Sequence, residues 1–413
     1  KNRLYYIDVK GMLSSLHGSA GAITALQNSV AHYYQRASSA DYLGVDPTRR
    51  SLTGTGGYVK VGRKGNAKWN FSETFTWSSP GFDLNDMGYM KETDYLMNET
   101  EIMYRQTDIW KIFRYNAFTL SQKNMWNYGG TPFSNNASLR WQSMTMNRYE
   151  WDVKETFAWN WLDSRLLRGG PDVRFGSYFL TSAKFNTDKA KRMMFMLKYE
   201  GDHNFEGNRF NTISPSLTFR LGNHVYLSGQ LDYAWNTDEM QYVATTSPLS
   251  SSSLAPYYYV MGHMDQKTYG LTLKLQVNVT PDISIQFYGA PFTSIAKYDD
   301  FKLAADTKSH TFENRFQRID PDQLTYADGV YTIGEGAGQM PFRNPDFRFN
   351  EFRSNLVARW EYLPGSTLYF VWEHRMSNRD NWYSSGWGSN LDRMWGLPAT
   401  NTFMIKMNYW FNL

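Results

Sequence analysis

Three oxygen-bearing side chains stand close together at Asp83, Asn85 and Asp86. Calcium prefers carboxylate and amide oxygens, so a calcium site is one interpretation of this segment. The twelve-residue spacing of an EF-hand loop is missing, and short polar side chains also stabilise ordinary turns by bonding to the backbone. We therefore expect a hydrogen-bonded turn here and no bound metal.

His263 and Asp265 come nearest to an acid–base pair. They share one face of an extended segment because their positions differ by two. The chain has 7 histidines, so such a pairing arises easily by chance. No Gly-x-Ser-x-Gly, Walker or His-Glu-x-x-His pattern occurs. We therefore predict that the protein is not an enzyme, has no catalytic residues and binds no cofactor.

Aromatic side chains at Tyr257, Tyr258, Tyr259, Trp382 and Trp387 form a third group with binding potential. They could stack on sugar rings, which would make a carbohydrate the ligand. Anchoring at a membrane boundary explains the same residues, because Trp and Tyr are enriched there. We favour the anchoring interpretation.

The elements that position these residues follow from an unusual composition. Aromatic residues make up 17% of the 413 residues, yet the mean hydropathy is -0.58. A membrane-spanning β-barrel combines aromatic girdles with a polar interior, so it is both aromatic-rich and hydrophilic. No run of about 18 apolar residues occurs, so we expect no membrane helix. A closed barrel is then the remaining way to satisfy every backbone group in lipid.

Charge and cysteine content exclude other classes of protein. The net charge is +4, with 43 basic and 39 acidic residues interspersed, so no basic stripe for nucleic acid is present. Cysteine is absent, which excludes a disulfide framework and a thiol-ligated metal. The absence of cysteine is compatible with an oxidising envelope compartment.

Two segments, residues 269–280 and 401–413, alternate clearly between apolar and polar side chains. In an outer-membrane barrel, lipid covers the apolar face and the lumen takes the polar one. For the last segment alone, an edge strand of a soluble β-protein is the alternative. The predicted lipid-facing residues are Leu271, Leu273, Leu275, Val277, Phe403, Ile405, Tyr409 and Phe411. The predicted lumen-facing residues are Lys198, Arg220, Lys274, Gln276, Lys406 and Asn408.

Two glutamates break this alternation. Glu73 shares a face with Phe75 and Trp77, and Glu155 shares a face with Phe157 and Trp159. Lipid disfavours a carboxylate on such a face. Three explanations stay open: a β-bulge that turns the glutamate away, an inverted facing of the strand, or a protein contact on the aromatic face.

The connections between predicted strands alternate in length. Short connections lie near residues 65, 107, 149, 188, 222, 282 and 365, with mostly longer ones between them. Short periplasmic turns and long outer loops are typical of outer-membrane barrels, and the count comes to about 16 strands. We expect one domain over residues 1–413. Residues 17–50 should form an outer loop with a short helix capped by Ser19 and running to about Arg36, and residues 299–351 a long outer loop or plug.

Several segments carry a resemblance to a known family. They are residues 22–36 (AITALQNSVAHYYQR), 79–90 (SPGFDLNDMGYM), 168–171 (RGGP), 344–347 (NPDF) and 352–372 (FRSNLVARWEYLPGSTLYFVW). They resemble the Gram-negative outer-membrane barrel family labelled the five-nine-one-six domain of unknown function. Its members often follow a family-nine-type carbohydrate-binding module and look longer at the N-terminus. On that reading, the chain is the C-terminal part of a larger barrel, and sixteen strands is a lower bound.

We therefore predict an all-β, antiparallel transmembrane barrel in a bacterial outer membrane, in contact with outer-membrane lipid. The first functional hypothesis is transport or secretion, with passage of a solute or polypeptide. The second is a non-catalytic structural or assembly subunit of an envelope complex, with protein partners at the outer loops and at Glu73 and Glu155. The third is a carbohydrate-related surface role through a missing N-terminal module. We rank transport slightly above assembly, and both above the third.

Overall fold

The computed structural model describes residues 4–36, 41–65, 67–86, 88–159, 161–249, 257–381 and 387–411. Alternating apolar and polar side chains extend the chain into long strands, as the period of two predicts. The long strands of the first half are β1 (Tyr5–His17), β2 (Ser51–Arg63), β3 (Trp69–Ser78), β4 (Tyr95–Gln106), β5 (Phe113–Trp126), β6 (Pro132–Thr145), β7 (Glu150–Trp159) and β10 (Tyr178–Asn186). Those of the second half are β11 (Met193–Asn204), β12 (Arg209–Leu221), β13 (Val225–Thr246), β14 (Tyr258–Asn278), β15 (Ile283–Ala304), β20 (Phe347–Leu363), β21 (Ser366–Asp380) and β22 (Thr400–Asn408).

Shorter elements lie in the connections. The short strands are β8 (Trp161–Asp163), β9 (Val173–Phe175), β16 (Phe316–Arg318), β17 (Leu324–Ala327), β18 (Val330–Ile333) and β19 (Met340–Arg343). The helices are α1 (Ala20–Gln27) and α2 (Trp387–Trp395), with single 3₁₀ turns η2 (Glu313–Arg315), η3 (Pro321–Gln323) and η4 (Gly336–Gly338). None of the helices within the described ranges is long and apolar enough to cross a membrane.

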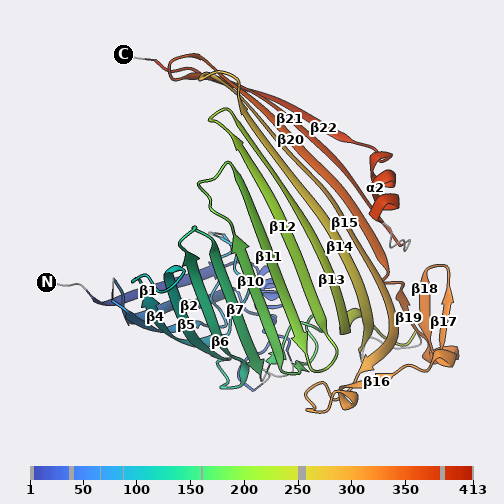
Figure 1. Cartoon of the computed structure of the whole chain (residues 1–413). Coiled ribbons are helices and arrows are strands. Elements are labelled where there is room, and N and C mark those ends of the chain that lie inside the picture. Colours follow the sequence, from blue (N-terminus) through green and yellow to red (C-terminus); the bar gives the residue numbers. More distant parts are fainter. Residues whose placement is uncertain are drawn as a thin grey trace.

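All the long strands belong to one antiparallel sheet of 17 strands, in which each pairs with its neighbours in the chain and β16 extends the end of β15. Figure 1 shows the sheet curled, with β1 and β22 apart from each other. Among the described strands, β1 bonds only to β2 and β22 only to β21. The sheet is therefore open, and these strands by themselves do not form the predicted closed barrel.

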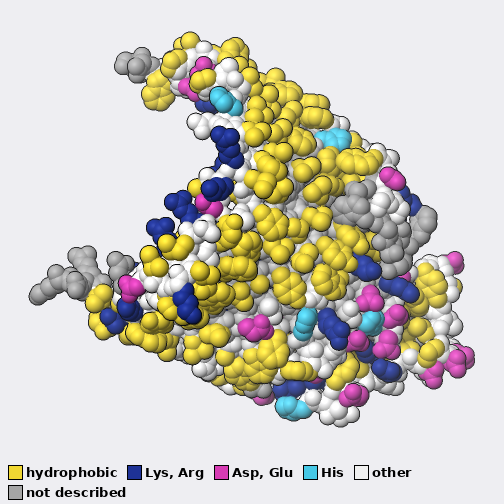
Figure 2. Space-filling model, viewed as in Figure 1, with side chains coloured by type: hydrophobic (Ala, Val, Ile, Leu, Met, Phe, Trp, Pro, Cys, Tyr) yellow, Lys and Arg dark blue, Asp and Glu magenta, His cyan; other side chains and the backbone are white. Residues whose placement is uncertain are grey.

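The two faces of the sheet differ in what covers them. Segment 79–94 packs on the face that carries Ser14, Gly54 and Gly56: the amide of Asp83 donates to Ser14 Oγ at 2.9 Å, and Phe82 is only 4% exposed. We call this the inner face and the opposite one the outer face. Figure 2 shows hydrophobic side chains spread over the outer face, with charged side chains gathered toward the end that carries β16 and β17.

The predicted alternation of connections is confirmed. One end of the sheet carries the turns at residues 64–68, 107–112, 146–149, 187–192, 222–224, 279–282 and 364–365. The other carries the connections at residues 18–50, 79–94, 127–131, 160–177, 205–208, 247–257, 305–346 and 381–399. Two of the tight turns need backbone angles that favour glycine: Gly222 has φ 63° and Gly365 has φ 78°.

Several boundaries differ from the sequence-based expectation. β13, β14 and β15 have 22, 21 and 22 residues, and β14 begins at Tyr258, well before the alternating segment 269–280. α1 begins as predicted, since Ser19 Oγ accepts from the amide of Ala22 at 3.2 Å, but it ends at Gln27 rather than near residue 36.

The predicted long loop is also more ordered than expected. β15 runs to Ala304, and within residues 305–346 the strands β17, β18 and β19 form a small sheet of their own. Its hydrophobic side chains Tyr331, Ile333 and Phe342 pack against Phe301 of β15. This packing buries the apolar side of the segment, so the segment is a folded structure attached to the end of the main sheet.

Candidate functional site on the inner face

The cross-strand register places the predicted lumen-facing residues together on the inner face. Arg220 aligns with Tyr226 and then with Gln276, while Lys274 lies two positions further along the same face. Lys406 and Asn408 lie on that face of β22, opposite Tyr369 and Thr367, and Lys198 lies on it in β11. The predicted lipid-facing residues of β14 and β22 lie on the outer face. Tyr409 and Phe411 follow the end of β22.

The inner face carries ion pairs within strands and, at Glu351, between two neighbouring strands. Glu351 Oε1 lies 2.8 Å from Arg353 Nη2 and 3.0 Å from Arg375 Nη2, so one carboxylate serves two guanidinium groups on β20 and β21. Lys198 Nζ lies 2.7 Å from Glu200 Oε2. Sequence reasoning missed the Glu351 pairs, because it placed residue 351 at the end of the long loop 299–351 and alternation does not give the register with β21. The inner wall therefore carries charges of both signs.

A pocket of about 230 Å³ opens on the inner face where the strands meet the long connections. Trp161, Tyr178 and Phe210 supply aromatic walls, and Asp202 and Asn236 supply polar groups. The rings of Trp161 and Tyr178 meet edge to face with centroids 5.4 Å apart. Aromatic walls with a carboxylate and an amide can hold a ligand that has both an apolar side and hydrogen-bond donors.

The first long connection is fixed by buried polar contacts. His32 is 1% exposed; its Nε2 lies 3.1 Å from Asp83 Oδ2 and its Nδ1 lies 2.9 Å from the carbonyl oxygen of Pro80. Burial raises the pKa of the nearby Tyr34 hydroxyl to about 12, an effect that Arg49 partly opposes. Buried polar groups that find such partners hold a segment in one conformation.

Asp94 is the second anchor of this region. Its carboxylate accepts from Arg36 Nη2 at 2.5 Å, from the Tyr42 hydroxyl at 2.6 Å and from the amide of Tyr128 at 3.0 Å. The carboxylate thus joins residues 18–50 to the connection after β5. The connections are packed against one another and against the inner face.

Segment 305–346 is anchored through Arg315, which is 1% exposed. Its two terminal nitrogens donate to the two carboxylate oxygens of Glu206, at 2.9 Å and 2.8 Å. Arg315 also donates to the carbonyl oxygens of Ser309 at 2.7 Å and Arg174 at 2.7 Å. Bidentate charge-assisted pairs are among the strongest side-chain hydrogen bonds, so this contact locks the segment to the connection after β11.

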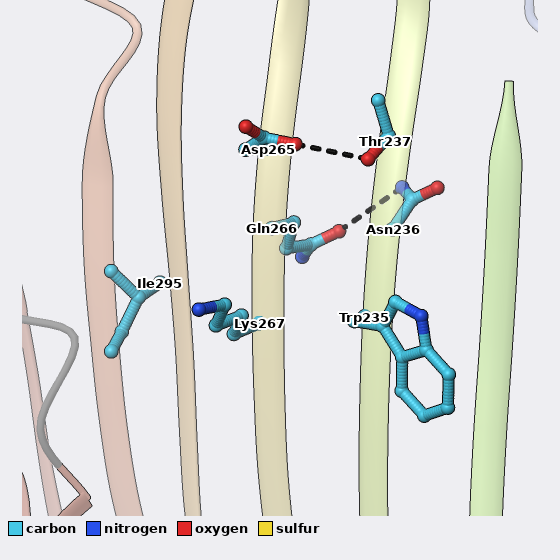
Figure 3. Close-up of a pocket in the computed structure, with 7 residues that line it drawn as sticks. All are labelled: Trp235, Asn236, Thr237, Asp265, Gln266, Lys267 and Ile295. Carbon is cyan, nitrogen blue, oxygen red and sulfur yellow. Dashed lines mark hydrogen bonds between the residues drawn. The ribbon is translucent and has the colours of Figure 1, made fainter. Parts of the chain in front are cut away.

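His263 and Asp265 do lie together, on the outer face near the end of β14. His263 Nε2 is 3.6 Å from Asp265 Oδ2, and its Nδ1 is 3.1 Å from Glu239 Oε1. Asp265 also accepts from the Thr237 hydroxyl at 2.9 Å. Figure 3 shows this hydrogen bond in the adjoining groove, where Lys267 points toward β15. The imidazole thus sits between two carboxylates in a surface charge cluster.

The expected turn at Asp83 is confirmed: Asp83 Oδ1 accepts from the amide of Asn85 at 2.8 Å. The part of the chain that the structure describes holds no group of three His, Cys, Asp or Glu side chains placed to bind a metal. Among the candidate sugar-stacking aromatics, Tyr258 and Tyr259 lie at the start of β14, just after Tyr257, and Trp387 begins α2. Trp382 lies outside the described residues.

Comparison with known proteins gives a family but no activity. No curated protein matches the chain. A family model described as "Domain of unknown function (DUF5916)" matches residues 18–413. The match includes every segment on which the resemblance in the sequence rests, and the chain belongs to this family.

Proposed function

We propose that the sheet is part of the wall of a transmembrane β-barrel in a bacterial outer membrane, and that the protein passes a solute or a polypeptide across that membrane. The observation that carries the proposal is the difference between the two faces of the sheet. Lipid would meet the outer face, and water would meet the charged inner face.

The outer face exposes more contiguous apolar surface than soluble proteins normally expose to water. Ile405 is 73% exposed, Phe403 64% and Leu273 40%, and similar side chains continue on the strands between them. Soluble proteins rarely expose contiguous apolar patches larger than a few hundred Å². Lipid removes this penalty, because hydrocarbon chains solvate Leu, Ile and Phe side chains.

The open edges of the sheet support closure by further strands. The outer edges of β1 and β22 present backbone N–H and C=O groups without strand partners among the described residues. Each unsatisfied backbone group in hydrocarbon costs several kcal/mol, so a membrane-embedded sheet must close on itself. Additional strands between β1 and β22 would close this one into a larger barrel.

The inner wall suits a hydrated cargo. It carries cations and anions side by side, as at Glu351, Arg353 and Arg375. At the long-connection end, residues 18–50 and 305–346 are folded and anchored, so they would narrow the entrance. A polar wall with a constricted mouth is typical of barrels that select or gate their cargo.

An assembly role is the second candidate, and one observation favours it. Glu73 and Glu155 lie on the outer face, which lipid would cover in the transport proposal. Glu73 accepts hydrogen bonds from Asn98 and Thr100, and Glu155 accepts from Thr181 at 2.7 Å. A protein partner would tolerate such polar positions better than lipid does.

The test combines mass and conductance of protein purified from native membranes in mild detergent. The proposal predicts a single polypeptide heavier than the 48.1 kDa of this chain, and discrete conductance steps in planar bilayers. A 48.1 kDa polypeptide with stoichiometric partner proteins and no conductance would overturn the transport proposal and support assembly.

A further inference from the structure

Six polar side chains form one continuous patch on the outer face of β3 to β6. The polar patch consists of Glu73, Asn98, Thr100, Gln122, Asn124 and Asn135. The register makes it continuous: Glu73 aligns with Thr100 and then with Gln122, while Asn98 aligns with Asn124 and then Asn135. The outer face of β14 carries leucines and a valine at the corresponding distance from the turns.

Part of the polar patch is satisfied internally and part is not. Glu73 accepts from the amide group of Asn98 and, at 2.6 Å, from the hydroxyl of Thr100. The side-chain amides of Gln122, Asn124 and Asn135 make no hydrogen bond with any other described residue. Each amide group can both donate and accept. These three amides are therefore free to bind a partner.

Glu73 and Thr100 lie near the middle of β3 and β4, and the patch extends from them toward the long-connection end of β5 and β6. On β3, Glu73 has Trp69 and Phe71 on one side and Phe75 and Trp77 on the other, all on the outer face. β3 has 10 residues, the length of a membrane-crossing strand. In the proposed membrane, the part of the patch around Glu73 and Thr100 would be level with the hydrocarbon core, and the amides of Asn124 and Asn135 would lie closer to the long-connection side.

We propose that a second copy of this chain covers the polar patch, through a two-fold axis along the membrane normal. Such an axis places the same surface of both copies in contact, so the surface must be complementary to itself. It sets β3 of one copy opposite β6 of the other, and β4 opposite β5. The carboxylate end of the patch, at Glu73, then faces the amide end, at Asn135.

The chemistry of the polar patch favours this occupant. Free amides that both donate and accept are self-complementary, and polar side chains of this kind join protein segments within membranes. The outer face of β3 to β6 carries no Lys or Arg at the patch, so the single carboxylate, already bonded, leaves little net charge to repel its copy. Lipid chains offer no donors or acceptors to these groups.

The experiment uses the absence of cysteine from the 413 residues of this chain. In Gln122→Cys, the new thiol lies in the middle of the polar patch, and Leu273→Cys is the matched control on the outer face of β14. Full-length protein in its native membranes is oxidised and sized, and nitroxide-labelled samples of the same variants are measured by pulsed dipolar spectroscopy.

The proposal predicts a disulfide-linked species of twice the monomer mass, and a short spin–spin distance, for Gln122→Cys alone. Replacing Gln122 and Asn124 by Leu should convert the dimer to a monomer without loss of the folded sheet. The proposal would be overturned if nitroxides at position 122 showed no short spin–spin distance. It would also be overturned if the disulfide-linked species had the mass of an adduct with a different protein.

This inference rests on the proposed membrane location, and the control variant separates the two failures. A nitroxide at position 273 should be accessible to lipid-dissolved oxygen if the outer face meets lipid. Failure of that control would count against the membrane proposal itself. If position 273 is accessible to oxygen and position 122 is equally accessible, lipid covers the polar patch and only the second-copy proposal falls.

Discussion

Replacing Arg315 by Met should release segment 305–346 from the main sheet. The substitution keeps an unbranched side chain of similar length but removes both hydrogen bonds to Glu206 and those to the carbonyl oxygens of Ser309 and Arg174. The Glu206 side chain is only 12% exposed beside Arg315, and after the substitution the amide of Gly176 still donates to it at 2.9 Å. Breaking a buried ion pair by removing one partner costs about 3–5 kcal/mol.

This cost should appear as local opening. A loss of about 3–5 kcal/mol raises the open population on the order of a hundred- to several-thousand-fold, since each 1.4 kcal/mol is about tenfold. Native-state hydrogen exchange of the Ala305 amide measures it, because that amide donates to the carbonyl oxygen of Arg315 at 2.8 Å. The double variant with Glu206→Gln should recover part of the loss, because no charge is then left buried.

Arg318→Met is the matched control. Arg318 lies three residues further along the same segment, with a side chain that is 78% exposed and 3.6 Å from Asp300. Exposed pairs contribute about 0–1 kcal/mol, so exchange at Ala305 should hardly change. If Arg315→Met accelerates exchange no more than Arg318→Met does, the buried pair is not what holds the segment.

Three further predictions follow from other regions. Burial raises the pKa of Asp346. Its contribution to the free energy of unfolding is therefore greatest below the ordinary carboxyl range and is lost as pH rises through the raised pKa. Asp346→Asn should raise the unfolding midpoint at pH 7 but not at low pH. A Cβ on Gly54 would collide with the backbone nitrogen of Phe82, whereas one on Gly11 meets nothing within 4 Å. Gly54→Ala should therefore increase proteolysis of segment 79–94, and Gly11→Ala should not. Leu273→Arg on the outer face should cost about 2–4 kcal/mol in lipid, while Thr272→Arg on the inner face should be tolerated, as folding titrations in bilayers would measure.

The strand segments with one apolar face and one polar face were predictable from the sequence. Between the turns near Gly222 and Gly365, a period of two sets the faces, and the turn glycines set where strands reverse. The first part of β14 lies outside the alternating segment 269–280, because residues such as Val260 and Met264 pack against a folded connection and both faces there carry mixed residues. Where neither face is purely apolar, alternation no longer marks a strand.

The facing of Glu73 shows a different limit. Its neighbours on the same face, Phe71 and Phe75, are aromatic, and they suggested a bulge or an inverted strand as readily as an outward carboxylate. The side chains that satisfy it, Asn98 and Thr100, are 25 and 27 residues away on the next strand. No register shift occurs between β3 and β4, so the alternation was read correctly and the glutamate does face outward. The deciding contacts were non-local, and a single sequence does not specify them.

The anchored connections also separate the two candidate functions. Arg315 and Asp94 hold residues 305–346 and 18–50 with buried, charged contacts, so neither connection moves aside without a cost of several kcal/mol. In a transport barrel these connections would stand in the path of the cargo, and Arg315→Met should raise single-channel conductance or open probability. In an assembly subunit the same substitution should open the segment equally, as hydrogen exchange reports, but leave bilayer conductance unchanged. Because the structural effect is common to both cases, a normal conductance with a released segment argues against a cargo path through this mouth.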